Sequence, residues 1–230
     1  MRVLGIIPAR GGSKGVPRKN IKMLDGLPLL AYSIQAAKES KLITHFVVAS
    51  EDDEILTIAK SFISPVFKRI ESNSLDDSPV TDVVKEVIND INDNYDLVLL
   101  LQPTAPIRTG HDIDNVISLF KNDDSLNNVV SVVELQDIHP ARMYTLNNSN
   151  QMFSLEKENE TKRRQDLAKV YLRNGSIYAV KTSFFLKTGL LMGASKKAYI
   201  MPESHWLNID TERDFLLAEG MIKMWKNGKL

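Results

Sequence analysis

The segment best suited to chemistry is a glycine-rich, basic loop near the N-terminus, residues 8–20 (PARGGSKGVPRKN). The apolar run at residues 3–7 predicts a buried strand that leads into this loop. Glycines let backbone N–H groups approach an anion, and basic side chains add positive charge. The residues concerned are Gly11, Gly12, Gly15, Arg10, Lys14, Arg18 and Lys19. We interpret the basic loop as a phosphate site, with a solvated surface turn as the alternative.

Spacing excludes two common phosphate loops. A P-loop requires G-x-x-x-x-G-K-[ST], and a dinucleotide-binding turn requires G-x-G-x-x-G at the start of a helix. Neither pattern occurs in residues 8–20. The basic loop therefore predicts a phosphate site of another kind.

The composition is that of an ordinary globular protein. In 230 residues, Lys plus Arg and Asp plus Glu both number 29, so no overall field favours nucleic acid or an anionic membrane. The chain has no cysteine, which excludes disulfides, thiolate nucleophiles and cysteine-bound zinc. It shows no signal-peptide core and no apolar run near the roughly 20 residues that span a bilayer. We expect one cytoplasmic domain with a modest appendage.

Strands alternate with helices along most of the chain. Apolar runs predict strands at 44–50, 65–68, 95–101 and 128–133, and helical periodicity predicts helices at 51–62, 79–91, 110–120 and 211–225. This order predicts an α/β fold, a mostly parallel central sheet with helices on both faces. Ligands of such sheets bind at the carboxyl ends of the strands. We expect the basic loop and the loop at 102–110 (QPTAPIRTG) to meet at that edge.

Regularity fails between about residues 135 and 170, which is too long for an ordinary connection. We interpret this segment as an insertion or flap that forms a dimer, with strand pieces at 142–146 and 151–155. The core resumes with a strand at 174–181, entered through an Asn174-Gly175 turn. A short helix at 182–187 and a strand at 198–201 follow. We expect residues 182–205 to form a second dimer contact.

Four motifs together resemble those of acylneuraminate cytidylyltransferases, also called CMP-sialic acid synthetases. They are IPARGGSKGVPRKN at 7–20, LLLQPTAPIRTG at 99–110, RRQDL with RNGSIY at 163–178, and NIDTERDF at 208–215. The resemblance implies the nucleotide-diphosphosugar transferase fold and a homodimer. It also implies CTP and a nine-carbon ulosonic acid as substrates, and dependence on Mg²⁺.

The resemblance also implies roles for residues that match the motifs. For CTP these are Arg10, Gly11, Gly12, Ser13, Lys14, Lys19 and Asn20, with Arg69 and residues 77–81, including Thr81, near the base. Positioned cations fit a reaction whose transition state carries much negative charge. Arg10, Lys19 and Asp210 are the predicted catalytic residues, and Lys19 the most sensitive. For Arg69 and 77–81, a polar loop that leads into a helix is the equal alternative.

The sugar side rests on similar matches. Gln102, Arg164, Gln165, Asn174 and Tyr178 match residues that face the sugar. An arginine suits the substrate carboxylate because its planar fork binds it bidentately. Some relatives have this arginine two places before the Asn-Gly pair, whereas this chain has it one place before, at position 173. For Arg108, a structural role and a ligand contact stay open.

The last motif implies the metal site. Asp210 matches the second of two alternating aspartates, and Asn208 stands in place of the first. Mg²⁺ usually needs one or two carboxylates plus phosphates and water, so we expect both residues to bind it. The alternative is that Asp210 caps the helix that follows it.

We therefore predict transfer of CMP from CTP to an N-acylneuraminate-type acid, a step toward surface polysaccharides. No motif offers an obvious general base, so we expect metal-activated or substrate-assisted deprotonation. The alternatives are legionaminate, pseudaminate or KDO as acceptor, or a non-catalytic nucleotide-binding protein. KDO synthetases carry Q-G-D-E-P where this chain has QPTAP at 102–106, which disfavours KDO.

Overall fold

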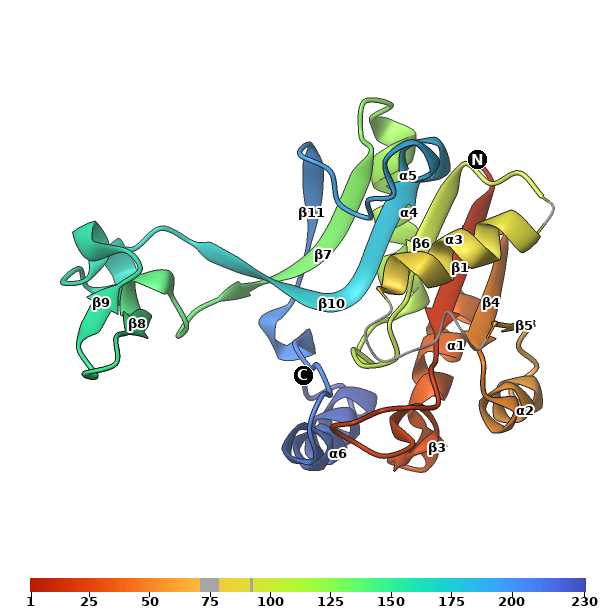
Figure 1. Cartoon of the computed structure of the whole chain (residues 1–230), viewed down its shortest axis with the longest axis horizontal. Helices are drawn as coiled ribbons and strands as arrows, with labels where there is room; N and C mark the ends of the chain where they lie inside the picture. Colours follow the sequence, from red (N-terminus) through yellow and green to blue (C-terminus); the bar gives the residue numbers. More distant parts are fainter. Residues whose placement is uncertain (71–78, 92) are drawn as a thin grey trace.

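A mixed sheet forms the centre of the molecule (Figure 1). The structure is a computed structural model that describes residues 1–70, 79–91 and 93–230. Within these residues the sheet has seven strands in the order β11-β7-β10-β6-β1-β4-β5. The strands are β1 Val3–Pro8, β4 His45–Ser50, β5 Val66–Lys68, β6 Leu97–Leu100, β7 Asn128–Leu135, β10 Val170–Lys181 and β11 Lys196–Met201. The pairs are parallel except where β10 meets β6 and β7. The predicted mostly parallel sheet is confirmed.

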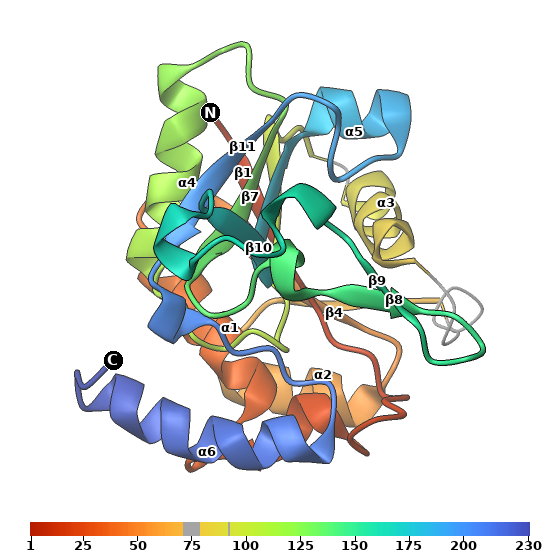
Figure 2. The same cartoon turned by 90° about the vertical axis from the view of Figure 1, so that its left-hand side faces the viewer.

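Helices cover both faces of the sheet, as expected (Figure 2). They are α1 Leu29–Glu39, α2 Asp53–Ser61, α3 Val80–Asp90, α4 Gly110–Asn122, α5 Thr182–Thr188 and α6 Glu212–Lys226. Because side chains alternate along a strand, Val3 and Ile7 of β1 pack with α1, α2 and α4, whereas Leu4 and Ile6 pack with α3 and α5. A third apolar cluster packs α6 against α1 and the basic loop residue Val16. This cluster brings α6, the last helix of the chain, beside the basic loop.

The starts of the helices follow from capping. Asp52 is the N-cap of α2 and accepts hydrogen bonds from the N–H groups of Glu54 and Ile55. Helices α4 and α6 each begin with a capping box, formed by Thr109 with Asp112 and by Thr211 with Asp214. The suggestion that Asp210 caps the last helix is therefore wrong, since Thr211 holds that position.

The insertion stands away from the sheet (Figure 1). Strands β7 and β10 lead into an antiparallel hairpin of β8 Tyr144–Leu146 and β9 Met152–Ser154, so both expected strand pieces are present. Short 3-10 turns at Pro140–Arg142, Lys157–Asn159 and Arg164–Asp166 complete it. Its role as a dimer contact stays a prediction, as does that of residues 182–205, which form α5, β11 and a 3-10 turn at Glu203–His205.

Strand β10 differs from its prediction. It begins at Val170, and Asn174-Gly175 lies inside it rather than in a turn before it. The register against β7 shifts between Arg173 and Tyr178, and Gly175 has a φ of 75°. This is a bulge, which glycine permits because it tolerates positive φ. The Asn-Gly pair therefore bends a long strand at the carboxyl edge of β6.

Smaller elements complete the N-terminal half. A two-stranded hairpin joins β2 Met23–Leu24 to β3 Leu27–Pro28 through a turn at Asp25 and Gly26, and a 3-10 turn spans Lys19–Ile21. Of the helices that the structure describes, none has the length and apolar character needed to cross a membrane.

Candidate active site

A cavity of about 400 Å³ lies at the carboxyl ends of β1 and β6. Five segments line it: the basic loop, the position just after β5, the start of α3, the loop after β6, and residues 208–210. Its lining residues are Pro8, Arg10, Ser13, Lys19, Asn20, Arg69, Val80, Val83, Gln102, Pro103, Thr104, Asn208 and Asp210. The fold thus brings together residues that lie up to 202 positions apart, from Pro8 to Asp210, including the three predicted catalytic residues. We call this the first cavity.

Lys19 connects the basic loop to the end of the chain. Its Nζ donates to the carbonyl oxygen of Ile209 at 2.7 Å and lies 3.2 Å from Asp210 Oδ1. The other carboxylate oxygen of Asp210 accepts a hydrogen bond from Asn208 Nδ2 at 2.5 Å. A cation and a carboxylate therefore meet at the wall of the first cavity.

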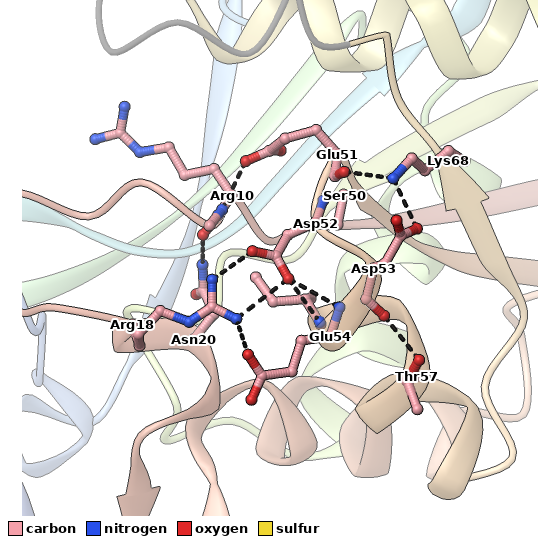
Figure 3. A network of polar contacts seen from close by, with 12 residues as sticks. Arg10, Arg18, Asn20, Ser50, Glu51, Asp52, Asp53, Glu54, Thr57 and Lys68 are labelled. Atoms are coloured by element: carbon pink, nitrogen blue, oxygen red, sulfur yellow. Dashed lines mark hydrogen bonds and ion pairs between the residues drawn. The ribbon is translucent and has the colours of Figure 1, made fainter.

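The other residues of the basic loop have different places. Asn20 is buried and donates to the carbonyl oxygen of Arg10 at 2.9 Å, so it holds the loop together. The Gly11 N–H donates to Glu51 Oε1 at 2.6 Å. The Arg18 guanidinium pairs with Asp52 and Glu54 (Figure 3). The expectation that Arg18 adds its charge to the phosphate site is therefore wrong in this structure. Gly12 and Lys14 belong to the loop beside the cavity rather than to its lining.

Arg69 lies in the wall of the first cavity between two acidic side chains. Its guanidinium is 3.9 Å from Glu51 Oε2 and 3.5 Å from Glu86 Oε2, and its side chain is 5% exposed. The two carboxylates flank the guanidinium of this buried arginine and hold it in position. The predicted contacts at positions 77 and 78 lie outside the described residues.

A second cavity of about 320 Å³ adjoins the first. It is lined by Val80, Thr81, Leu100, Gln102, Arg173, Tyr178, Leu190, Leu191 and Met192. Val80 and Gln102 belong to both cavities, so the two spaces meet at the end of β6. Of the predicted residues, Gln102, Tyr178 and Thr81 face this space. Its other side chains are mostly apolar, apart from Arg173, whose Nη1 donates to the sulfur of Met192 at 3.4 Å.

Comparison with known proteins decides the family. A model of the cytidylyltransferase family matches residues 4–200, most of the chain. The chain belongs to the cytidylyltransferase family.

Curated relatives of this cytidylyltransferase have several names. Post-translational flagellin modification protein B of Campylobacter coli is 32% identical over 96% of this chain and 95% of its own length. Pseudaminic acid cytidylyltransferase of Campylobacter jejuni (strain 81-176) is 31% identical over 97% of both chains. N-acylneuraminate cytidylyltransferase of Streptococcus agalactiae (serotype V) is 32% identical over 96% of this chain and 54% of its own length. The chain therefore shares the family's cytidylyltransferase activity, while the acceptor differs among its relatives.

Solved structures confirm the expected α/β fold. A CMP:2-keto-3-deoxy-manno-octonic acid synthetase complexed with CTP superposes with a TM-score of 0.74, at 17% identity over 99% of this chain and 100% of its own. A 4-diphosphocytidyl-2C-methyl-D-erythritol synthase from Anaerococcus prevotii superposes with a TM-score of 0.65, at 12% identity over 96% of both chains. At these identities the likeness concerns the fold.

Some predicted sugar residues of the cytidylyltransferase lie elsewhere. Arg164 and Gln165 line a third cavity of about 610 Å³, which is built from the insertion, and Arg164 pairs with Asp137 at 2.5 Å. Asn174 is buried, and its Oδ1 accepts a hydrogen bond from Ser131 Oγ at 2.6 Å. In this single chain Asn174 ties the β10 bulge to β7. The sugar roles of all three residues stay predictions.

Arg108 has a structural place in the cytidylyltransferase. It is 1% exposed and donates to the carbonyl oxygens of Ser176 at 2.6 Å and Gln102 at 3.1 Å, and also to Ser33 Oγ. Burial lowers the pKa of the Arg108 guanidinium to about 9, which leaves it charged at neutral pH. Arg108 thus holds the loop that carries Gln102 against the β10 bulge.

Asp210 and Asn208 offer a donor set that suits Mg²⁺ bound mainly through substrate phosphates. The Asp210 side chain is 62% exposed and faces the first cavity. Among the described residues, no group of three or more His, Asp or Glu side chains is placed to hold a metal. Since Mg²⁺ commonly uses one or two carboxylates with phosphates and water, one carboxylate is compatible with it. The metal itself stays a prediction.

Sequence reasoning missed several walls of the site. Val83 follows the helical periodicity of α3, which predicts a helix at this position but not a cavity wall. Arg173 stands one position from the matching arginine of some relatives, yet beside the β10 bulge it still lines the second cavity. A bulge changes the alternation of side chains along a strand, so spacing alone misplaces such a residue.

Proposed function

We propose that this cytidylyltransferase transfers CMP from CTP to the anomeric hydroxyl of a nine-carbon ulosonic acid of the N-acylneuraminate type. The observation that carries the proposal is the meeting of the two cavities at Gln102. One cavity holds cations suited to a triphosphate, and the other is an apolar space with an arginine. Relatives whose names specify such acids support the choice of acceptor.

The first cavity suits the nucleotide. Arg10 and Lys19 line it from the basic loop, and Ser13 adds a hydroxyl. Fixed cations stabilise the charge that develops on transferred phosphoryl oxygens without the reorganisation that water would require. In the proposal, Lys19 holds the phosphates while its bond to the Ile209 carbonyl keeps it in place.

The second cavity suits the acid. Arg173 can bind a carboxylate through its planar fork, and Gln102 and Tyr178 can donate hydrogen bonds to hydroxyl groups. Leu190, Leu191 and Met192 form apolar walls that suit the methyl of an N-acyl group. An acid in this space would present its anomeric hydroxyl toward the first cavity, beside Gln102.

The reaction breaks one bond and forms another. The anomeric hydroxyl gives up its proton, which a phosphate oxygen of the substrate can accept, and its oxygen attacks the α-phosphorus of CTP. The bond from this phosphorus to the bridging oxygen breaks, and pyrophosphate leaves with that oxygen. In the proposal, the residues of the two cavities hold CTP and the acid side by side for this displacement. Asp210, with Asn208 beside it, would hold Mg²⁺, which when bound neutralises phosphate charge.

Pseudaminate is the second candidate acceptor. The pseudaminic acid cytidylyltransferase matches this chain over nearly the full length of both, whereas the N-acylneuraminate enzyme is about twice as long. A mostly apolar second cavity also suits an acid that carries several acyl or methyl groups. Legionaminate and KDO stay as further alternatives, and a non-catalytic nucleotide-binding protein is the alternative of another class.

A panel of acceptors tests the proposal. Pyrophosphate release would be measured from CTP and Mg²⁺ with N-acetylneuraminate, legionaminate, pseudaminate or KDO. The proposal expects turnover with N-acetylneuraminate, while a preference for pseudaminate would replace the acceptor and keep the reaction. Failure with all four acids, with CTP still bound, would favour the non-catalytic alternative.

A further inference from the structure

The acidic turn at the start of α2 holds the basic loop at two points (Figure 3). The Gly11 N–H donates to Glu51 Oε1 at 2.6 Å. The Arg18 guanidinium contacts both carboxylate oxygens of Asp52, with Nη2 at 3.2 Å from Oδ1, and also reaches Glu54. The loop is therefore attached near its beginning and near its end to one turn of the neighbouring element.

Asp52 is itself firmly placed. Its Oδ1 accepts hydrogen bonds from the N–H groups of Glu54 at 2.9 Å and Ile55 at 3.1 Å, and its own N–H donates to Ser50 Oγ at 3.0 Å. Because these bonds belong to the junction of β4 and α2, Asp52 presents a fixed carboxylate to Arg18. The core elements of the fold thus determine where the loop can lie.

The loop conformation matches this attachment. A Cβ atom on Gly11 would lie 2.5 Å from Asp52 Oδ2, so a larger residue could not approach the acidic turn so closely. Arg18 has a φ of 54°, a left-handed conformation that a non-glycine residue adopts when its surroundings hold it there. From the same loop, the Arg10 guanidinium points away from Asp52 (Figure 3).

The ion pair between Arg18 and Asp52 also affects the electrostatics of the basic loop. The hydrogen bond from Arg18 holds the pKa of the Asp52 carboxyl below its ordinary value, so this carboxylate is ionised at neutral pH. Its charge offsets that of Arg18, which would otherwise repel Arg10 and Lys19 in the same short loop. Arg10 and Lys19 keep their places in the lining of the first cavity.

We propose that Asp52 and Glu51 are positioning residues for the nucleotide and that Arg18 braces the basic loop instead of binding phosphate. The inference rests on the proposed function because it concerns CTP in the first cavity. Loss of the Asp52 charge should loosen the loop and weaken CTP binding. The acid, which we place in the second cavity, should bind as before.

Asp52→Asn tests this directly, because asparagine caps a helix as well as aspartate but presents a neutral amide to Arg18 in place of the carboxylate. We expect KM for CTP to rise about tenfold and KM for the acid to stay within about twofold. Asp53→Asn is the matched control. It removes the same charge at the next position, where Asp53 pairs with Lys68 at 2.7 Å rather than with Arg18. Equal KM values for CTP in the two variants would overturn the proposal.

Arg18→Gln, alone and combined with Asp52→Asn, tests whether Arg18 braces the basic loop or binds phosphate. If the pair acts as one unit, the double variant should weaken CTP binding no more than either single variant does. If Arg18 binds phosphate, its loss should weaken CTP binding again in the Asp52→Asn background, and the proposal would be wrong. Glu51→Gln, expected to raise KM for CTP, gives a second variant should Asp52→Asn fold poorly.

Direct calorimetry of CTP binding keeps this inference distinct from the proposed function. A wild-type protein that binds CTP without releasing pyrophosphate would contradict the proposed reaction. The variants would then still report on the brace through the Kd for CTP. A wild-type protein that turns over, with Asp52→Asn unchanged in both measurements, would contradict the brace alone.

Discussion

Lys19 links the two halves of the active site at the scale of single residues. Its side chain is 13% exposed and holds both the Ile209 carbonyl and the Asp210 carboxylate. Because such a cation is fixed before substrate arrives, we predict that it stabilises the transition state without first being ordered. The resemblance predicted this residue, and the structure adds the two partners that hold it.

Lys19→Met should therefore lower kcat/KM by about 100-fold, the usual cost of one fixed charge or donor at a transition state. Lys22→Met is the control, since Lys22 also pairs with an acid near the start of α6, Glu212, at 2.6 Å but is not part of the first cavity's lining. Steady-state kinetics would compare the two variants. A Lys19→Met rate within about threefold of that of Lys22→Met would contradict the predicted role.

The Mg²⁺ dependence of the rate tests the residues at 208 and 210. Asn208→Asp should lower the Mg²⁺ concentration that gives half the maximal rate, because a second carboxylate strengthens an oxygen site. Asp210→Ala should raise this half-maximal Mg²⁺ concentration steeply. Glu212→Gln changes an acid two residues away and should leave that concentration unchanged. A rate for Asp210→Ala close to wild type would show that Asp210 has no metal role.

Two neighbouring residues of the basic loop show that residue type alone does not determine what a side chain contacts. Arg18 and Lys19 are adjacent cations, and the sequence suggests the same role for both. The left-handed backbone at Arg18 sends one toward α2 and leaves the other at the cavity. Tertiary contacts with Asp52 and Ile209, which are far apart in sequence, decide between them.

At the scale of elements, the basic loop and residues 208–210 must touch for the site to form. A Cβ atom on Gly15 would lie 2.0 Å from the carbonyl oxygen of Asp210, a separation that real side chains do not reach. Gly15 therefore sets the approach of these two segments. In contrast, a Cβ atom on Gly12 would meet no described atom within 4 Å.

Gly15→Ala should push the two segments apart, with a loss of about 1–3 kcal/mol in the free energy of unfolding, the usual cost of overpacking. Activity should fall further, because Lys19 and Asp210 both move. Gly12→Ala is the control for stability, and its free energy of unfolding should stay near that of wild type. Chemical denaturation and kinetics of the two variants would check this, and equal behaviour would show that the contact is unimportant.

Elements with strong periodicity were predicted well, and β10 was not. Residues 79–91 carry apolar side chains at helical spacing, and α3 spans Val80–Asp90. The direction of β10 and its bulge have no local signal, because they depend on its pairing with β6 and β7. For the same reason, the sequence did not show that Asn174 would be buried against Ser131.

At the scale of the whole molecule, the insertion exposes a group of apolar side chains. Leu146, Met152, Phe153 and Leu155 are each more than half exposed in or next to the β8–β9 hairpin. Exposed apolar side chains grouped in this way commonly mark an interface. The homodimer expected from the resemblance would cover them.

Phe153→Asp should therefore convert a dimer to a monomer, because an interface does not readily bury an unpaired charge. Leu216→Asp is the control, since Leu216 is an exposed apolar residue on α6, away from the insertion. Sedimentation equilibrium would measure the mass of both variants and of the wild type. A monomeric wild type, or a dimer that survives Phe153→Asp, would contradict this interface.

The central claim is transfer of CMP from CTP to a sugar acid across the two cavities. The most direct measurement is the product balance of one reaction with CTP, Mg²⁺ and the preferred acid, followed by phosphorus NMR. The account predicts one pyrophosphate for each CMP-linked acid formed, and no reaction when the acid is left out. Release of inorganic phosphate with CDP, or pyrophosphate without a CMP-linked acid, would contradict it.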